Sequence, residues 1–148
     1  TKSICVGLEP CVIPALGHSN FKIEDGTMEF GVGHHGEAGT KVEKLKSASE
    51  MAQEMAETIL NDFDFEEGKE VAVMLSGLGA TPVMELYVLY DEVEKVLAKA
   101  GHKVWKTYIG NYVTSLDMNG ASLTIVDLDD EIKELLSEPA VPIGMKNY

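Results

Sequence analysis

The feature of this sequence that most constrains its fold is a nearly continuous apolar run at residues 70–76, EVAVMLS. A run that is apolar on both sides of an extended chain is typical of a strand covered on both faces of its sheet. A glycine-containing link follows, and then an amphipathic helix for which Thr81 is the expected cap and Pro82 the expected first residue. A buried, central strand followed at once by a helix indicates an α/β domain.

The rest of the chain contains the same two kinds of segment. The β-rich runs fall at 3–9, 27–33, 70–76, 103–109 and 121–127. Apolar residues recur at helical spacing over 41–60, 82–100 and 129–136. The apolar faces of these three helices are expected to include Val42, Leu45, Val83, Tyr87, Ile132, Leu135 and Leu136. We expect a single α/β domain with a mixed β-sheet and helices packed on it.

Two strands of this sheet are expected to be neighbours. Residues 103–109 and 121–127 are separated by a link that includes the turn-prone residues 117–120. Because neighbouring strands joined by a short gap usually form a hairpin, an antiparallel pair is predicted here. A turn before the run at 70–76 is predicted from Phe63, Phe65 and Gly68.

The charge and the cysteines exclude several classes of partner and location. The formal net charge is -13, which repels phosphate backbones and anionic lipids, so neither nucleic acid nor membrane is expected as a partner. The chain has no apolar run of membrane-spanning length and no secretory start, which favours a cytoplasmic protein. Cys5 and Cys11 lack a disulfide or zinc pattern and are expected to be reduced and partly buried.

The most unusual local sequence is GVGHHGEAG at residues 31–39. Glycines on both sides of two histidines allow a sharp bend that leaves an imidazole uncovered at the end of a strand. A neutral imidazole is a nucleophile that can add to a ketone, giving a hemiaminal. Because the ordinary pKa of histidine is about 6.5, the nucleophilic form dominates near neutrality unless a nearby carboxylate raises that pKa, and Glu37, two residues from His35, is placed to do so.

Other interpretations of the same residues remain open. A glycine- and histidine-containing loop can be a solvated turn without function, and His34, His35 and Glu37 are also potential metal ligands, although no second cluster has zinc-like spacing. The link at residues 76–82 lacks the lysine and the spacing of a P-loop, which favours a structural turn over a phosphate site. The acidic residues 127–131 lack the spacing of a calcium loop and indicate a helix start.

Three segments taken together make the chain similar to the dihydroxyacetone kinase family. They are GVGHHGEAG at 31–39, LGATP with ELY over 78–87, and YVTSLDMNG at 112–120, and they match in order and spacing. The resemblance covers about residues 3–142. It implies that residues 1–148 are the second, C-terminal domain of the dihydroxyacetone-binding (K) subunit, with the preceding domain absent from this sequence.

The resemblance also implies roles. The histidine that binds the ketone covalently as a hemiaminal corresponds to His35, whereas His34 stands where the family usually has an aliphatic residue and Ala38 replaces a proline. Further pocket residues, including a His and Asp acid/base pair, belong to the preceding domain of the family. No cofactor is expected in this domain: ATP or ADP with Mg is bound by a separate, nucleotide-binding (L-type) subunit or domain. The K subunit is expected to be a homodimer, and the isolated domain is expected to be inactive.

The sequence leaves three questions open within this family. The parent protein is expected to be a kinase of glycerol metabolism that phosphorylates dihydroxyacetone (glycerone) to dihydroxyacetone phosphate, and the alternative is a ketose-sensing relative that acts as a transcriptional co-regulator. The phosphoryl donor is either ATP or a phosphotransferase relay. The ketose is either dihydroxyacetone or the four-carbon erythrulose.

Overall fold

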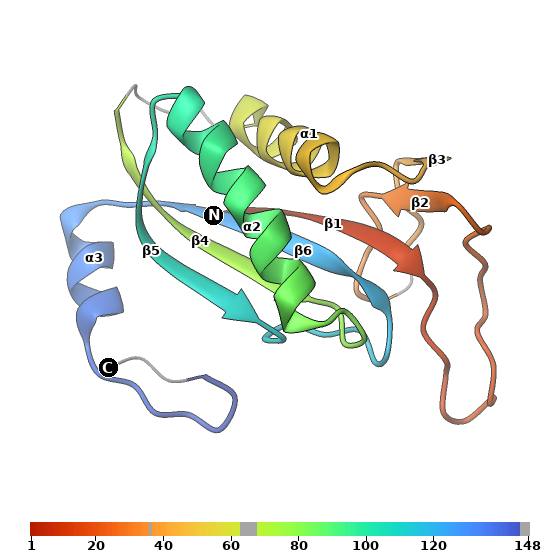
Figure 1. Ribbon diagram of the computed structural model, residues 1–148. Coiled ribbons are helices and arrows are strands. Elements are labelled where there is room, and N and C mark those ends of the chain that lie inside the picture. The colour runs from red at the N-terminus through yellow and green to blue at the C-terminus, as the bar shows by residue number, and fades with distance from the viewer. Residues whose placement is uncertain (36, 63–67, 146–148) are drawn as a thin grey trace.

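The computed structural model describes residues 1–35, 37–62 and 68–145. These residues form one domain built on a six-stranded sheet with the order β3-β2-β1-β6-β4-β5 (Figure 1). The strands are β1 (Lys2–Glu9), β2 (Thr27–Phe30), β3 (Lys41–Lys44), β4 (Glu70–Gly77), β5 (Lys103–Gly110) and β6 (Asn119–Asp127). The helices are α1 (Ala48–Asn61), α2 (Val83–Lys99) and α3 (Asp130–Ser137). Only the β4–β5 pair in the described chain is parallel, so the predicted α/β domain with a mixed sheet is confirmed.

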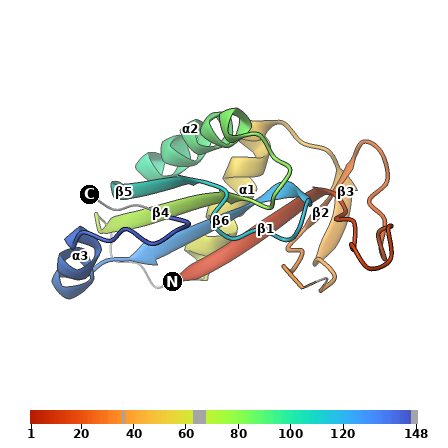
Figure 2. The same cartoon turned by 90° about the horizontal axis from the view of Figure 1, so that it is seen from below.

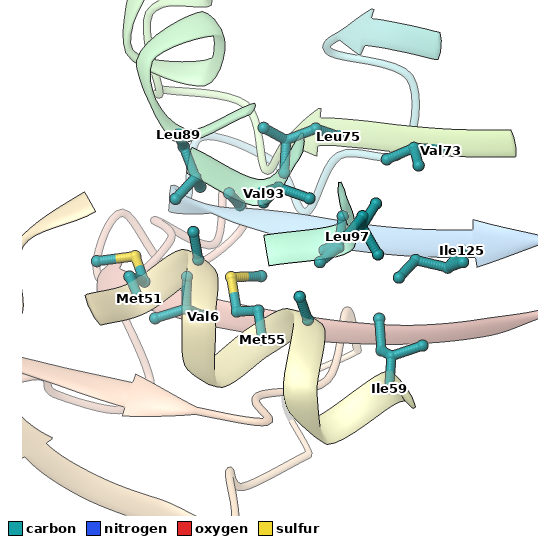
Figure 3. Close-up of a cluster of buried hydrophobic side chains, with 14 of the residues drawn as sticks. Val6, Met51, Met55, Ile59, Val73, Leu75, Leu89, Val93, Leu97 and Ile125 are labelled. Atoms are coloured by element: carbon teal, nitrogen blue, oxygen red, sulfur yellow. The ribbon is translucent and has the colours of Figure 1, made fainter. Parts of the chain in front are cut away.

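The main hydrophobic core lies between the sheet and two helices. α1 and α2 pack against each other on the same face of the sheet, as Figures 1 and 2 show from two sides. The side chains that meet there are fully or almost fully buried and include Val6, Met55, Leu75, Val93, Leu97 and Ile125 (Figure 3). Because a strand alternates its side chains between two faces, every second residue of β4 and β6 enters this core.

The strand β4, which contains the nearly continuous apolar run at residues 70–76, is largely buried on both faces. Val71, Val73 and Leu75 pack under the helices, while on the other side Ala72 and Ser76 are 2% and 1% exposed and Met74 is half-buried. β4 lies between β6 and β5, one place in from the edge of the sheet. The prediction of a strand covered on both faces is confirmed, although the strand is not at the middle of the sheet.

The predicted antiparallel pairing of 103–109 with 121–127 is wrong. β4 lies between the two strands, with Val73 opposite Thr107 of parallel β5 and opposite Ile125 of antiparallel β6. The strand β6 carries the fully buried Leu123 and Ile125, and a position between β1 and β4 satisfies its backbone groups on both sides. The short link therefore passes over the end of β4 instead of forming a hairpin.

The first predicted helix begins later than its apolar pattern indicates. Residues 41–44 form β3, which pairs with β2, and Val42 and Leu45 are 65% and 52% exposed. α1 starts after Ser47, whose hydroxyl accepts from the amide of Glu50 while the Glu50 carboxylate accepts from the amide of Ser47. This capping box stabilises a helix start at Ala48, whereas the residues before it gain backbone partners as a strand.

The start of α2 also differs from the prediction. Pro82 occupies the cap position and Thr81 makes no cap hydrogen bond; its hydroxyl instead bonds the backbone of Gly120. Val83 and Tyr87, predicted on the apolar face, are exposed, because the buried face is made by Leu86, Leu89, Val93 and Leu97.

The last helix lies at the end of the sheet where β4 and β5 begin. Lys133 of α3 pairs with Glu70 at 2.8 Å, and Lys106 of β5 donates to the carbonyl of Leu136 at 2.7 Å. Asp129 caps the helix through the amide of Ile132, so the acidic start of this helix is confirmed. Leu135 is 65% exposed and does not pack as predicted.

Three smaller predictions concern the remaining segments. Phe63 and Phe65 of the expected turn lie outside the described residues, while Gly68 has the positive φ of a turn residue. Cys5 and Cys11 are free and buried. In the described part of the chain, no helix is both long and apolar enough to span a membrane.

Candidate functional site

The segment that carries the two histidines leaves the sheet at the end of β2. The strand ends at Phe30, three residues earlier than predicted, because Gly31 takes a φ of +78° that only glycine adopts freely. The amide of Gly31 still donates to the carbonyl of Cys5 on β1 at 2.7 Å. We call residues 31–35 and 37–40 the histidine loop; it leaves the sheet opposite the middle of β1, where Phe30 pairs with Val6.

The imidazole of His35 is exposed to solvent. Its side chain is 90% accessible, and its Nδ1 lies 3.8 Å from a carboxylate oxygen of Glu37. The other Glu37 oxygen accepts from the amide of His35 at 3.0 Å. Hydrogen bonds from the backbone amides of Glu37 itself and of His35 lower the pKa of the Glu37 carboxyl, so this group is an anion near neutrality.

Gly33 makes the close approach of Glu37 possible. Its amide donates to the Glu37 carbonyl at 2.9 Å, and a Cβ added at Gly33 would meet the Glu37 carboxylate at 2.1 Å. A side chain at this position would therefore displace the carboxylate from His35. The glycine pattern of the histidine loop thus serves the placement of the acid next to the imidazole.

The neighbouring His34 points the other way, into the domain. Its Nδ1 lies 3.8 Å from the sulfur of Cys5, and its Nε2 is buried without a hydrogen-bond partner among the described residues. Burial raises the pKa of the Cys5 thiol, against a smaller opposite effect of the Ser122 hydroxyl, so the sulfur near His34 is a neutral thiol. Within residues 1–35, 37–62 and 68–145, no group of three or more His, Cys, Asp or Glu side chains is arranged to hold a metal ion.

A cavity of about 340 Å³ lies beside the two histidines. Three segments that are far apart in the sequence form its wall: the link between β1 and β2, the histidine loop, and residues 111–118, which we call the support loop. The lining side chains and backbone come from Cys11, Ile13, Asn20, Phe21, Gly33, His34, His35, Thr114, Ser115, Leu116 and Met118. The cavity is large enough for a small polar molecule to reach the His35 ring.

Hydroxyl groups hold the support loop in place. The Ser76 hydroxyl at the end of β4 accepts from the amides of Tyr112 and Val113 at 3.0 and 2.9 Å. Further along, the Ser115 hydroxyl donates to the carbonyl of His34 at 2.8 Å, which ties the support loop to the histidine loop. Leu116, the next residue, lines the cavity, has a φ of +54° and is 54% exposed.

The glycine-containing link before α2 acts as the base of the support loop. The amide of Ser115 donates to the carbonyl of Leu78, and Gly79, with a φ of +134°, lies against the backbone of Leu116. A Cβ at Gly79 would be 2.0 Å from the Leu116 carbonyl oxygen. The interpretation of residues 76–82 as a structural turn agrees with these contacts, although the Thr81 hydroxyl bonds Gly120 and caps no helix.

Several residues of the cavity wall could not be predicted from sequence patterns. Asn20 ends the stretch 10–20, whose proline and glycine indicate only a connection, Phe21 follows it, and Cys11 is predicted only to be a reduced, partly buried thiol. The support loop is indicated by its resemblance to a family segment but by no periodicity, and nothing in the sequence indicates the positive φ of Leu116.

Comparison with known proteins places this geometry in a family. Residues 1–143 match the model of the Dak1 domain. The chain is 42% identical over 130 residues to the dihydroxyacetone-binding subunit DhaK of the PTS-dependent dihydroxyacetone kinase 1 of Listeria innocua, covering 88% of this chain and 40% of that protein. It is 36% identical over 140 residues to the D-erythrulose kinase of Mycolicibacterium smegmatis, covering 95% of this chain and 24% of that protein.

Solved structures give the same result. The dihydroxyacetone kinase operon co-activator Dha-DhaQ superposes with a TM-score of 0.85 at 30% identity, over 93% of this chain and 43% of that one. The native dihydroxyacetone kinase of C. freundii gives a TM-score of 0.81 at 27% identity, over 92% of this chain and 24% of that one. The chain spans between 24% and 43% of the length of these curated relatives and structures. A match over almost the entire chain shows that it belongs to the Dak1 domain family.

Proposed function

We propose that the chain is the ketose-binding, C-terminal domain of a dihydroxyacetone kinase K subunit, and that it holds dihydroxyacetone covalently on His35. The observation that carries the proposal is the 90% exposed imidazole of His35 beside a cavity and within reach of an ionised carboxylate. The names of the relatives, which include dihydroxyacetone-binding subunits and erythrulose kinases, support a small ketose as the ligand.

The bond that forms joins the Nε2 of His35 to the ketone carbon of the substrate. The lone pair of neutral Nε2 attacks, the carbonyl π electrons move to oxygen, and the ring becomes positively charged. The Nδ1 proton is then released and the oxygen takes up a proton, which leaves a neutral hemiaminal. The Glu37 carboxylate, 3.8 Å from Nδ1, favours the tautomer with the proton on Nδ1 and the lone pair on Nε2.

A site that binds its ligand through a covalent bond to a ketone carbon distinguishes ketoses from polyols by their reactivity. Glycerol carries the same hydroxyl groups but no carbonyl, so it forms no hemiaminal. Once bound, the ketose has its terminal hydroxyl held at a fixed position for in-line phosphoryl transfer. In this proposal the nucleotide and Mg belong to a separate nucleotide-binding subunit, and the isolated domain is inactive.

The decisive experiment uses the full-length protein and dihydroxyacetone labelled with ¹³C at the carbonyl carbon. In the wild type, the ketone carbon resonance is replaced by that of a carbon bonded to nitrogen and hydroxyl. The His35→Asn variant should lose this resonance, and the control variant His18→Asn should keep it, because His18 bonds the Ser19 carbonyl outside the cavity wall. A hemiaminal signal that persists in the His35 variant would contradict the proposal.

A second function has a specific observation in its favour. The co-activator Dha-DhaQ is similar to this chain at a TM-score of 0.85, so a ketose-sensing co-regulator with the same His35 chemistry is the alternative. The two functions differ in turnover. A kinase subunit forms dihydroxyacetone phosphate when mixed with its nucleotide-binding subunit and a phosphoryl donor, whereas a sensor binds the ketose without product.

The donor, the ketose and the assembly complete the proposal. Relatives named PTS-dependent and PEP-dependent favour a phosphotransferase relay over ATP as the phosphoryl source, and adding either donor to the coupled assay distinguishes them. Comparing dihydroxyacetone with erythrulose in that assay identifies the preferred ketose. A homodimer and a cytoplasmic location are proposed from the family resemblance, and sedimentation of the full-length protein tests the first.

A further inference from the structure

We propose that Ser115 is a positioning residue that sets the direction of the His35 side chain. The proposal rests on the proposed function, because the direction of the ring matters only if His35 attacks a ketone. Ser115 lies 81 residues from His34 in the sequence, yet its hydroxyl is one of the groups that touch the histidine loop directly.

The peptide group that joins His34 to His35 is bonded on both sides. Its carbonyl oxygen, on His34, accepts from the Ser115 hydroxyl at 2.8 Å. Its N–H, on His35, donates to the Glu37 carboxylate at 3.0 Å. One planar unit is therefore held at both ends, and its rotation about the chain is restricted from two sides.

The orientation of this peptide plane sets the direction in which the His35 side chain leaves the backbone, and the Glu37 carboxylate, 3.8 Å from Nδ1, lies beside the ring. The plane fixes ψ of His34 and φ of His35, and these angles set the direction of the bond from Cα to Cβ. The ring itself is 90% exposed, so packing does not fix it. A backbone constraint is the means by which such an exposed nucleophile can be aimed at a ketone.

Ser115 is suited to this role because its own position is rigid. The residue is 9% exposed, its amide donates to the Leu78 carbonyl at 2.8 Å, and its carbonyl accepts from the Met118 amide at 3.1 Å. The link that follows β4 therefore provides the fixed point, and the Ser115 hydroxyl transmits that position to the histidine loop. Glu37, by contrast, is an exposed residue of the histidine loop itself and cannot anchor the loop to the domain.

The test compares Ser115→Ala with Ser115→Thr in the full-length protein. The measured quantities are the apparent dissociation constant of the ¹³C hemiaminal, the KM and kcat in the coupled assay, and the melting temperature. We expect Ser115→Ala to raise the dissociation constant and KM about fivefold, the factor for about 1 kcal/mol, the net strength of one hydrogen bond. The kcat at saturating ketose should stay within about a factor of two, because the adduct once formed is the same.

Two further variants separate positioning from a loosened cavity. Ser115→Thr keeps the hydroxyl and should restore most of the affinity. Ser19→Ala is the matched control: it also removes a hydroxyl that donates to a carbonyl, that of Cys11 at 2.6 Å, but in a wall segment without a histidine. An unchanged dissociation constant in Ser115→Ala, no recovery in Ser115→Thr, or an equal loss in Ser19→Ala would each overturn the proposal.

The outcomes also separate this proposal from the one on which it rests. A wild-type protein that forms no hemiaminal contradicts the role of His35, and the Ser115 variants are then irrelevant to it. A wild-type protein that forms the hemiaminal, together with a Ser115→Ala variant that forms it equally well, leaves the function intact and removes Ser115 from the mechanism.

Discussion

The region under the two helices and the loops that carry the candidate site are held together by different forces. Between the sheet and α1 and α2, apolar side chains such as Leu75, Leu97 and Leu123 are 0% exposed. In the loops that carry the site, the connections between segments are hydrogen bonds of the Ser76, Thr81 and Ser115 hydroxyls to backbone groups. The first region gives the domain its stability, whereas the second gives the site its geometry.

The magnitudes explain why these two roles can be separated. Burying one large aliphatic side chain contributes about 1.5–3 kcal/mol, and the helix-covered region has many of them. One ordinary hydrogen bond contributes about 1 kcal/mol net. Loss of a single hydroxyl in the loops that carry the site therefore leaves the domain folded, while the position of an exposed side chain in those loops can change substantially.

The largest effect on stability is expected from a substitution that leaves an empty space in the core under α1 and α2. Leu123 on β6 is fully buried, so Leu123→Ala should lower the free energy of unfolding by about 3 kcal/mol. Urea unfolding measures this loss. At low temperature, where the variant is folded, its ketose affinity should equal that of the wild type, and a parallel loss of affinity would show that the two regions are coupled.

A smaller effect on stability, with a larger effect on the site, is expected from Gly79→Ala. The added Cβ would lie 2.0 Å from the Leu116 carbonyl at a φ of +134°, so the support loop must move, at a cost of about 1–3 kcal/mol. The hemiaminal signal should weaken severalfold, which the ¹³C titration detects. Gly26→Ala is the control, because Gly26 also has a positive φ but nothing within 4 Å of its added Cβ; a similar loss of signal there would make backbone strain, not the contact, the cause.

The smallest effect is expected from ion pairs at the far end of the sheet. Lys133 and Lys103 lower the pKa of Glu70 below its ordinary value of 4.5. A lowered folded-state pKa stabilises the fold above the unfolded-state value and loses that stabilisation as the pH falls through the folded-state value. The melting temperature of Glu70→Gln should therefore be slightly below that of the wild type at neutral pH, and the difference should vanish as the pH falls below 4.5.

The comparison variant for this pH series is Glu37→Gln in the histidine loop. Glu37 also has a lowered pKa, but its partners lie in the histidine loop. Because the Glu37 side chain is exposed and its partners are amides of the same short loop, we expect its melting temperature to depend on pH less than that of Glu70→Gln, while its ketose affinity falls. A melting temperature as sensitive as that of Glu70→Gln would mean that the histidine loop contributes to global stability.

The elements with a clear hydrophobic period were predictable from the sequence. The buried face of α1, with Met51, Ala52, Met55, Ala56 and Ile59, follows the helical spacing, and β4 follows from its continuous apolar run. The errors fall where two local patterns compete. Val42 and Leu45 fit the helical period, but the Ser47 capping box and the pairing of β3 with β2 decide the boundary.

By itself, the sequence determined the α/β class, the strands and helices with strong periodicity, and the placement of an exposed histidine in a glycine-containing bend, because these depend on local spacing and backbone freedom. Only the tertiary structure decided that β4 separates β5 from β6 and that Ser115 meets the His34 carbonyl. Such contacts join residues far apart in the chain, and their free energy depends on the burial and backbone pairing of the whole sheet. This free energy cannot be inferred from a local pattern of residues.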